Sequence, residues 1–347
     1  MKRSGYLEIS LFSVVMLAVT VLPGFGQPTQ TKTPQTKTQP EFDSYSACYN
    51  EKDFTKKADL CQKFVDRFQE SDFLITGYKF IIQSYYQTGN WQLLMDVADK
   101  AAGLPNANDT WKNYAYQSAM VGAQKANNLD KAIAYGDKVL QIDPNDLTAL
   151  YTVSSVITQK SSTDIPQLEK AAEMARKALL VAASMMDKAS PEEKPKLVQM
   201  DGALHGTLGL ISYNEMDYKK SIQEYQAAVK DDAKDETAHF LMAYDYIQLM
   251  TQASKDYQTS LNAENAAKAA RADQPTVDDL AAKRADFQEQ VLTYRDLVID
   301  ELAITVAING QYTAQAKPLL IKQWTDKNNS TAGLDEFVNQ KKTQLGG

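Results

Sequence analysis

The sequence is poor in the residues that most often build catalytic and metal sites. Its 347 residues include two histidines and two cysteines. It also lacks the segments Gly-x-Ser-x-Gly, His-Glu-x-x-His and Gly-x-Gly-x-x-Gly, which place a serine nucleophile, a pair of zinc ligands and a phosphate-binding loop, respectively. We therefore expect no catalytic residues, no cofactor and no metal, and we predict that the chain is not an enzyme.

Clusters of basic residues are missing as well. Lysine and arginine together number 37, against 44 aspartates and glutamates, which gives a formal net charge of -7. A protein that binds nucleic acid needs clustered basic side chains to neutralise phosphates. The charge balance therefore argues against a nucleic-acid partner.

Long apolar runs are confined to the N-terminus. Two basic residues precede an apolar run from Leu11 to Leu22, and Gly24 and Gly26 supply the small residues that a signal peptidase reads. We predict a signal peptide over residues 1–26 that is cut after Gly26. The alternative is an uncleaved anchor, but the run is shorter than the roughly 20 residues that span a bilayer. We therefore expect no integral membrane segment in the mature chain, and a periplasmic or secreted location.

Residues 27–40 contain only threonine, glutamine, lysine and proline. Such a segment has no apolar side chain to bury, so we predict a disordered leader between the cut and the folded part.

Two stretches of the chain share one pattern, Tyr116–Asn145 and Leu208–Val229. In the later copy, Leu208-Gly209 is followed by a turn at Asp217-Tyr218, and Asn128-Leu129 occupies that turn in the earlier copy. The pattern resembles the tetratricopeptide repeat (TPR), a 34-residue helical hairpin. The resemblance implies an all-α fold, a right-handed α-solenoid of stacked helical hairpins, which we place over residues 41–250.

The register decays beyond Met250. We expect an alanine-rich helix over residues 262–272, then a helix with Thr276 as its N-cap that stops near Asn309-Gly310. The last repeat of a solenoid must cover an apolar face that would otherwise be exposed. We therefore predict that residues 251–347 form an irregular helical cap.

The two histidines, His205 and His239, are 34 residues apart and so occupy the same position of the repeat. The first helices of stacked hairpins lie about 8–10 Å apart, too far for two imidazoles to share a metal ion. We predict that both histidines are packing residues.

The two cysteines fall in the first hairpin, Cys48 on its first helix and Cys61 on its second. Their positions normally carry a packed aromatic pair in TPRs, so the resemblance implies that the side chains face one another. An exported chain keeps disulfides, and we predict a Cys48–Cys61 disulfide; two buried free thiols are the alternative. Cys48 lies far from the predicted cut, which argues against a lipoprotein.

TPR proteins usually bind ligands on the concave face of their first helices. Carried over to this sequence, the ligand-contacting positions hold mainly tyrosines and neutral amides, which suit an extended peptide bound by stacking and hydrogen bonds. The alternative is that the tyrosines only line a solvated face. The predicted partner-binding residues are Lys79, Gln83, Tyr86, Tyr114, Gln117, Gln124, Tyr151, Tyr213, Asn214, Phe240 and Tyr244.

These patterns predict an exported TPR scaffold that binds a protein or peptide client in the bacterial cell envelope. The main alternative is an envelope protein that binds a glycan or a nutrient in an aromatic-lined groove, and the missing lipoprotein cysteine argues against it. The sequence indicates neither the client nor the oligomeric state.

Overall fold

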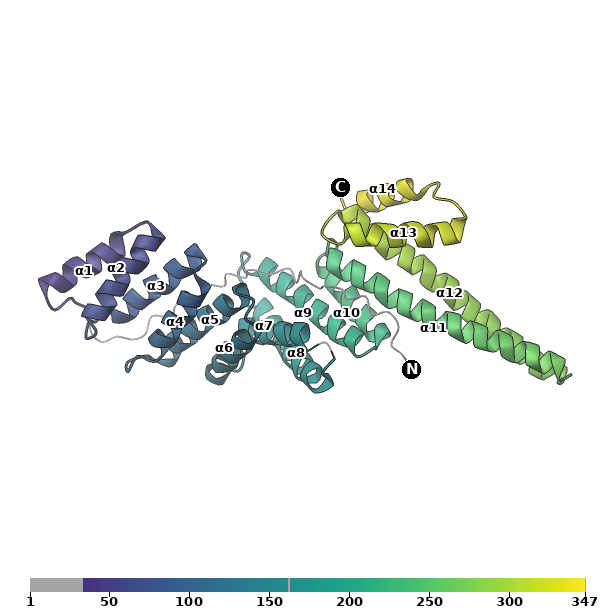
Figure 1. Cartoon of the computed structure of the whole chain (residues 1–347), viewed down its shortest axis with the longest axis horizontal. Coiled ribbons are helices and arrows are strands. Elements are labelled where there is room, and N and C mark those ends of the chain that lie inside the picture. Colours follow the sequence, from purple (N-terminus) through teal and green to yellow (C-terminus); the bar gives the residue numbers. More distant parts are fainter. Residues whose placement is uncertain (1–33, 162, 347) are drawn as a thin grey trace. The chain divides into compact units, whose positions relative to one another are not determined.

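The computed structural model describes residues 34–161 and 163–346. All regular secondary structure in this part of the chain is α-helical. The predicted signal peptide, residues 1–26, and residues 27–33 of the predicted leader lie outside the described residues. The chain divides into two compact units, one ending at Ser161 and the other beginning at Ser162. Figure 1 shows the helices of both units.

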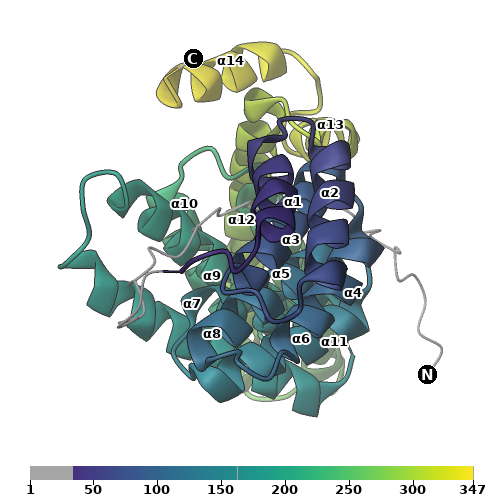
Figure 2. The same cartoon turned by 90° about the vertical axis from the view of Figure 1, so that its left-hand side faces the viewer.

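The first unit consists of helices that pair as hairpins. They are α1 (Gln39–Asn50), α2 (Phe54–Arg67), α3 (Leu74–Thr88), α4 (Trp91–Ala102), α5 (Asp109–Lys125), α6 (Leu129–Ile142) and α7 (Leu147–Lys160). Each helix packs against the next one in the chain, and α1 also contacts α3, as α3 contacts α5. Figure 2 shows α1, α2 and α3 side by side. The stacking of successive hairpins confirms the predicted TPR-like α-solenoid.

Short polar side chains start most of these helices. The Asp53 carboxylate accepts a hydrogen bond from the Lys56 backbone N–H at 2.9 Å, and Asn108 caps α5 in the same way through the Trp111 N–H. Each such cap satisfies one of the backbone donors that a helix start leaves without an intrahelical partner. The α3 helix ends at Gly89, whose φ of 70° is a left-handed conformation that favours glycine.

A disulfide joins Cys48 on α1 to Cys61 on α2, as predicted, and both side chains are fully buried. Such a bond is compatible with a protein that resides outside the cytoplasm. Among residues 34–161 and 163–346, no helix is both long and apolar enough to cross a membrane.

The second unit begins with further hairpin helices and ends differently. Its helices are α8 (Ile165–Met186), α9 (Lys194–Asn214), α10 (Tyr218–Asp231), α11 (Glu236–Ala269), α12 (Gln274–Ile308), α13 (Thr313–Asn328) and α14 (Leu334–Gln344). The α8, α9, α10 and α11 helices each pack against the next one, while α11 and α12 form a long helical pair and α12 carries both α13 and α14.

In the C-terminal region, the predicted N-cap at Thr276 was wrong, whereas α12 ends at Ile308, close to the predicted stop at Asn309-Gly310. The α11 helix runs without interruption through Met250, where we expected the repeats to end, because no glycine or proline interrupts residues 236–269. The α12 helix has Asp273 as its N-cap instead of Thr276, and the Asp273 side chain accepts from the Thr276 backbone N–H at 2.9 Å. The region after Met250 contains the rest of α11 and then α12, α13 and α14, all α-helices.

Candidate partner-binding face

The predicted binding residues of the first unit lie on α3, α5 and α7, the first helices of their hairpins. Five of them are half-buried, namely Lys79, Gln83, Tyr86, Gln117 and Gln124, and the other two are buried. The exposed fractions of Tyr114 and Tyr151 are 7% and 8%. The two tyrosines therefore offer little surface to a partner.

The structure brings three of the predicted residues together where α3 meets α5. The Lys79 ammonium lies 6.0 Å from the centre of the Tyr114 ring, and Gln83 is hydrogen-bonded to Tyr114. Burial raises the pKa of the Tyr114 hydroxyl to about 12, so the hydroxyl stays neutral. This group connects two stacked helices.

The next junction, between α5 and α7, is also bridged. Gln117 donates a hydrogen bond to Asp146, whose carboxylate caps α7 by accepting from the Ala149 N–H at 2.9 Å. Burial raises the pKa of Asp146. Gln117 is thus engaged in holding a helix start, and Tyr151 packs one turn further along α7. The middle of the predicted face is occupied mainly by links between helices.

The most exposed aromatic side chains on these first helices are ones that the sequence analysis did not select. Phe42 and Tyr49 on α1 have exposed fractions of 51% and 55%. They are seven residues apart, two helical turns, and so lie on one face of α1. The Tyr49 ring meets the half-buried Phe80 ring edge-on at 5.8 Å, and the Lys57 ammonium lies 4.8 Å from the centre of the Phe80 ring. We call Phe42, Tyr49 and Phe80 the terminal aromatic face.

A sequence signal for this face existed. Phe42 and Tyr49 stand at the same positions of the first hairpin as Lys79 and Tyr86 do in the second. The repeat pattern of the first hairpin is degenerate, which obscures the correspondence of these two positions.

The adjoining side of α1 packs against the rest of the unit. Tyr45 stacks on Phe73 with ring centres 4.3 Å apart, and Cys48 is bonded to Cys61. The Tyr45 and Tyr49 ring centres are 6.0 Å apart, so the packed aromatic side chain of α1 adjoins the exposed ones. Exposed apolar side chains gathered on one face often mark an interaction site.

The predicted binding residues of the second unit are mostly engaged in internal packing. Phe240 has no exposed surface and stacks on Tyr312 with ring centres 4.6 Å apart. The prediction that Phe240 contacts a partner was therefore wrong, because a residue just before α13 covers it. Tyr244 is half-buried and meets Phe240 edge-on, Tyr213 meets Tyr218 edge-on, and Asn214 is half-buried.

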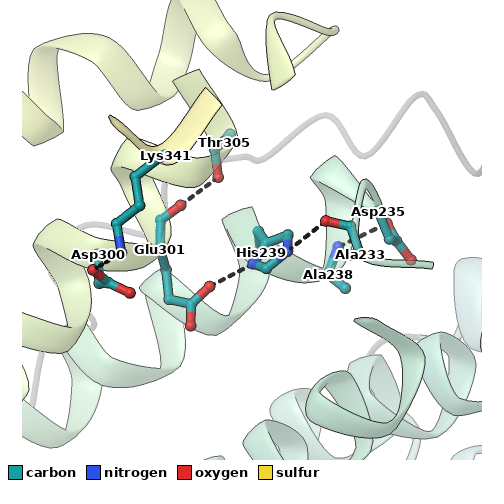
Figure 3. Close-up of polar contacts among 8 residues, drawn as sticks. All are labelled: Ala233, Asp235, Ala238, His239, Asp300, Glu301, Thr305 and Lys341. Atoms are coloured by element: carbon teal, nitrogen blue, oxygen red, sulfur yellow. Dashed lines mark hydrogen bonds and ion pairs between the residues drawn. The ribbon is translucent and has the colours of Figure 1, made fainter. Parts of the chain in front are cut away.

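Both histidines have carboxylate partners. In Figure 3, His239 on α11 bridges to Glu301 on α12, with Nδ1 2.6 Å from the carboxylate and Nε2 3.3 Å from the Ala233 carbonyl oxygen. The carbonyl can only accept, so Nε2 carries a proton. His205 Nδ1 lies 2.7 Å from the Glu224 carboxylate, and this hydrogen bond raises the pKa of His205. Across the described ranges, no three histidine, cysteine or acidic side chains are grouped to hold a metal ion.

No protein-family profile and no curated protein matches the sequence. Solved structures with a similar chain path include the C-terminal part of a TPR repeat-containing protein from Cytophaga hutchinsonii, at 13% identity and a TM-score of 0.42 over 86% of this chain and 98% of that chain. A tetratricopeptide repeat protein from Parabacteroides merdae gives 10% identity and a TM-score of 0.42 over 83% and 100% of the two chains. MamA from Desulfovibrio magneticus RS-1 gives 14% identity and a TM-score of 0.41 over 63% and 96%. Similarity at this level says nothing of function, and the paired helices of the chain itself define its TPR-like architecture.

Proposed function

We propose that this chain is an exported scaffold that binds a peptide segment of a partner protein on the terminal aromatic face. The exposure of Phe42 and Tyr49 on one side of α1 is the observation that carries the proposal. Large aromatic side chains supply most of the contact energy in many protein interfaces. Their exposure in the free chain leaves apolar area that a partner can bury.

The size of the face suits a short peptide segment. Phe42 and Tyr49 stand about 10 Å apart along α1, a distance that three to four extended residues cover. Phe80 adds a third ring from the neighbouring first helix. An apolar or aromatic peptide side chain fits this set better than a charged one, because the three selected side chains are uncharged.

Export is the second part of the proposal. It is supported by the predicted signal peptide and by the Cys48–Cys61 disulfide, which forms and persists in oxidising compartments. We expect the mature chain to begin at Gln27, as checked by the intact mass of protein recovered outside the cytoplasm. A mass that retains residues 1–26 contradicts the proposed cleavage. A client in the bacterial cell envelope follows from this location.

Photocrosslinking tests the binding face directly. The photoreactive residue p-benzoylphenylalanine is placed at position 49, and in a control chain at position 93, where Leu93 on α4 has an exposed fraction of 48%. We expect a discrete crosslinked protein from position 49 in intact cells and none from position 93. Equal crosslinking from both positions, or none from either, contradicts the proposal. A crosslink from position 49 to a glycan instead of a protein supports the glycan-binding alternative.

Selection from a displayed library of random peptides gives a second test. The library is selected on the disulfide-bonded chain, and the enriched peptides are then tested for binding to that chain and to a Phe42→Ser/Tyr49→Ser variant. We expect enriched peptides that carry aromatic or aliphatic residues and bind only the unsubstituted chain. Peptides that bind both chains equally place the site elsewhere.

A further inference from the structure

The α1 helix carries two of the three residues of the terminal aromatic face, yet few of its side chains anchor it. Its fully buried residues are Glu41 and Cys48. By contrast, α2 buries Ala58, Cys61, Phe64 and Val65. Among the described residues, α1 packs mainly against α2 and α3.

The noncovalent contacts of α1 are modest. The Ser71 hydroxyl donates to the Glu41 carboxylate at 2.6 Å, Tyr45 stacks on Phe73, and Tyr49 meets Phe80. The Lys57 ammonium also donates to the Tyr49 carbonyl oxygen at 2.9 Å, in an exposed position. Exposed hydrogen bonds contribute little to stability because water replaces them on opening. The Tyr45 ring also lies 5.5 Å from the Phe64 ring of α2, and the covalent link from Cys48 to Cys61 adds to these contacts.

We propose that the Cys48–Cys61 disulfide controls whether α1 stays docked and so whether the terminal aromatic face is assembled. With the bond formed, α1 is held against α2, and Phe42 and Tyr49 are presented beside Phe80. With the bond reduced, α1 undocks while α2 to α7 stay folded, since the core that contains Phe64, Ile81, Leu94 and Met120 takes only one of its buried residues, Cys48, from α1. The consequence for partner binding rests on the proposed function, whereas the undocking of α1 does not.

The reductant in this step is a dithiol. A thiolate of the dithiol attacks one sulfur, a mixed disulfide forms, and the second thiol of the dithiol displaces the protein sulfur. The dithiol loses two electrons and two protons and becomes a disulfide, while Cys48 and Cys61 take them up and become thiols. Both sulfurs are fully buried, so attack requires α1 to open first. Reduction is therefore expected to be slow in the folded chain.

The size of the effect follows from loop closure. The two cysteines are 13 residues apart, and releasing a loop of this length shifts the equilibrium between docked and undocked α1 by about a hundredfold in the chain-entropy model. The α1 helix buries only Glu41 and Cys48, so its noncovalent contacts offset little of this shift.

Amide hydrogen exchange on the full chain tests the undocking. The chain is measured oxidised, after treatment with dithiothreitol, and as a Cys48→Ala/Cys61→Ala variant, and thiol titration verifies that two thiols have formed. We expect exchange over residues 39–50 to accelerate by about a hundredfold in the reduced chain and in the variant, with little change over residues 91–160. Dithiothreitol should have no effect on the variant, which controls for other actions of the reductant.

Two results overturn the inference. Unchanged exchange over residues 39–50 in the verified reduced chain means that noncovalent contacts are sufficient to hold α1. Accelerated exchange over the whole of residues 54–160 means that the disulfide supports the entire unit. A fluorescent peptide from the library selection then reports on binding, which we expect reduction to abolish. If α1 undocks and that peptide still binds, or if no peptide is selected at all, the proposed binding face is wrong and the inference about α1 stands.

Discussion

The Asp245 carboxyl group and the Ser221 hydroxyl share a hydrogen bond of 2.7 Å in the interior of the second unit. The same hydroxyl lies 2.9 Å from the Gly209 carbonyl oxygen. A serine hydroxyl has one hydrogen, and it can donate to only one of these two acceptors. Both contacts of the Ser221 hydroxyl are hydrogen bonds when Asp245 is protonated and donates to Ser221, which in turn donates to Gly209.

This geometry leads to a prediction about pH. Burial of Asp245 raises its pKa to about 8 in the folded chain, against about 3.9 for an unfolded aspartate. Between these two values the folded state holds a proton that the unfolded state releases. The contribution of Asp245 to stability is therefore fully present below about pH 4 and is lost as the pH rises towards about 8, at up to about 1.4 kcal/mol per pH unit.

An Asp245→Asn variant, which keeps a donor at this position, should lack that slope and be more stable than the unsubstituted chain at pH 8. The buried Tyr225 hydroxyl nearby stays neutral over this range, because burial raises its pKa. Urea unfolding from pH 4 to pH 9 measures the difference between the two chains, and Asp286→Asn on the exposed side of α12 is the control. Parallel pH profiles for the unsubstituted chain and Asp245→Asn are incompatible with a protonated Asp245.

Two glycines of α9 provide a matched test of close packing. A Cβ atom at Gly209 would lie 2.6 Å from the fully buried Tyr225 ring, whereas a Cβ at Gly206 would have no neighbour within 4 Å. We expect Gly209→Ala to lower the free energy of unfolding by about 1–3 kcal/mol and Gly206→Ala to raise it by about 0.5–1 kcal/mol. Thermal and urea unfolding compare the two variants, and a destabilised Gly206→Ala chain argues against this packing.

The sequence predicted the structural features that depend on the spacing of residues within one hairpin. The 34-residue frame predicted the hairpins from Leu74 to Ile142, and the positions of Cys48 and Cys61 predicted the disulfide. Contacts between distant segments were not predictable in this way. Phe240 is buried by Tyr312, which lies 72 residues later, and no periodic pattern pairs the two. The exposure of Phe42 also depends on which segments pack beside α1, which a repeat frame does not specify.

The buried Glu236 links the start of α11 to the start of α13. Its carboxylate accepts from the Gly310 backbone N–H at 3.2 Å, from the Tyr312 N–H at 3.0 Å and from the Thr313 hydroxyl at 3.3 Å. We expect Glu236→Ala to destabilise the second unit by about 1–3 kcal/mol, because these backbone donors lose their partner. Glu236→Gln keeps an acceptor oxygen and should cost less. Equal losses in both variants would show that packing, and not hydrogen bonding, is responsible.

Truncation of exposed and buried aromatic residues should separate binding from folding. Tyr86, Tyr114 and Tyr151 were the tyrosines that the sequence favoured for binding, but the near-complete burial of Tyr114 and Tyr151 means that a triple alanine variant should be markedly destabilised. Tyr151→Ala alone should cost about 3–5 kcal/mol in unfolding free energy, by analogy with other large aromatic truncations.

Phe42→Ala and Tyr49→Ala should instead leave the unfolding free energy within about 0.5 kcal/mol while each weakens peptide binding by about 1–2 kcal/mol. Because the contacting side chains are uncharged, salt should screen the interaction little. Calorimetric titration with a library-selected peptide in low and moderate salt, alongside urea unfolding, measures both quantities. If Tyr49→Ala binds the peptide normally, or if moderate salt alone releases it, the partner is held by a different and charged surface of the chain.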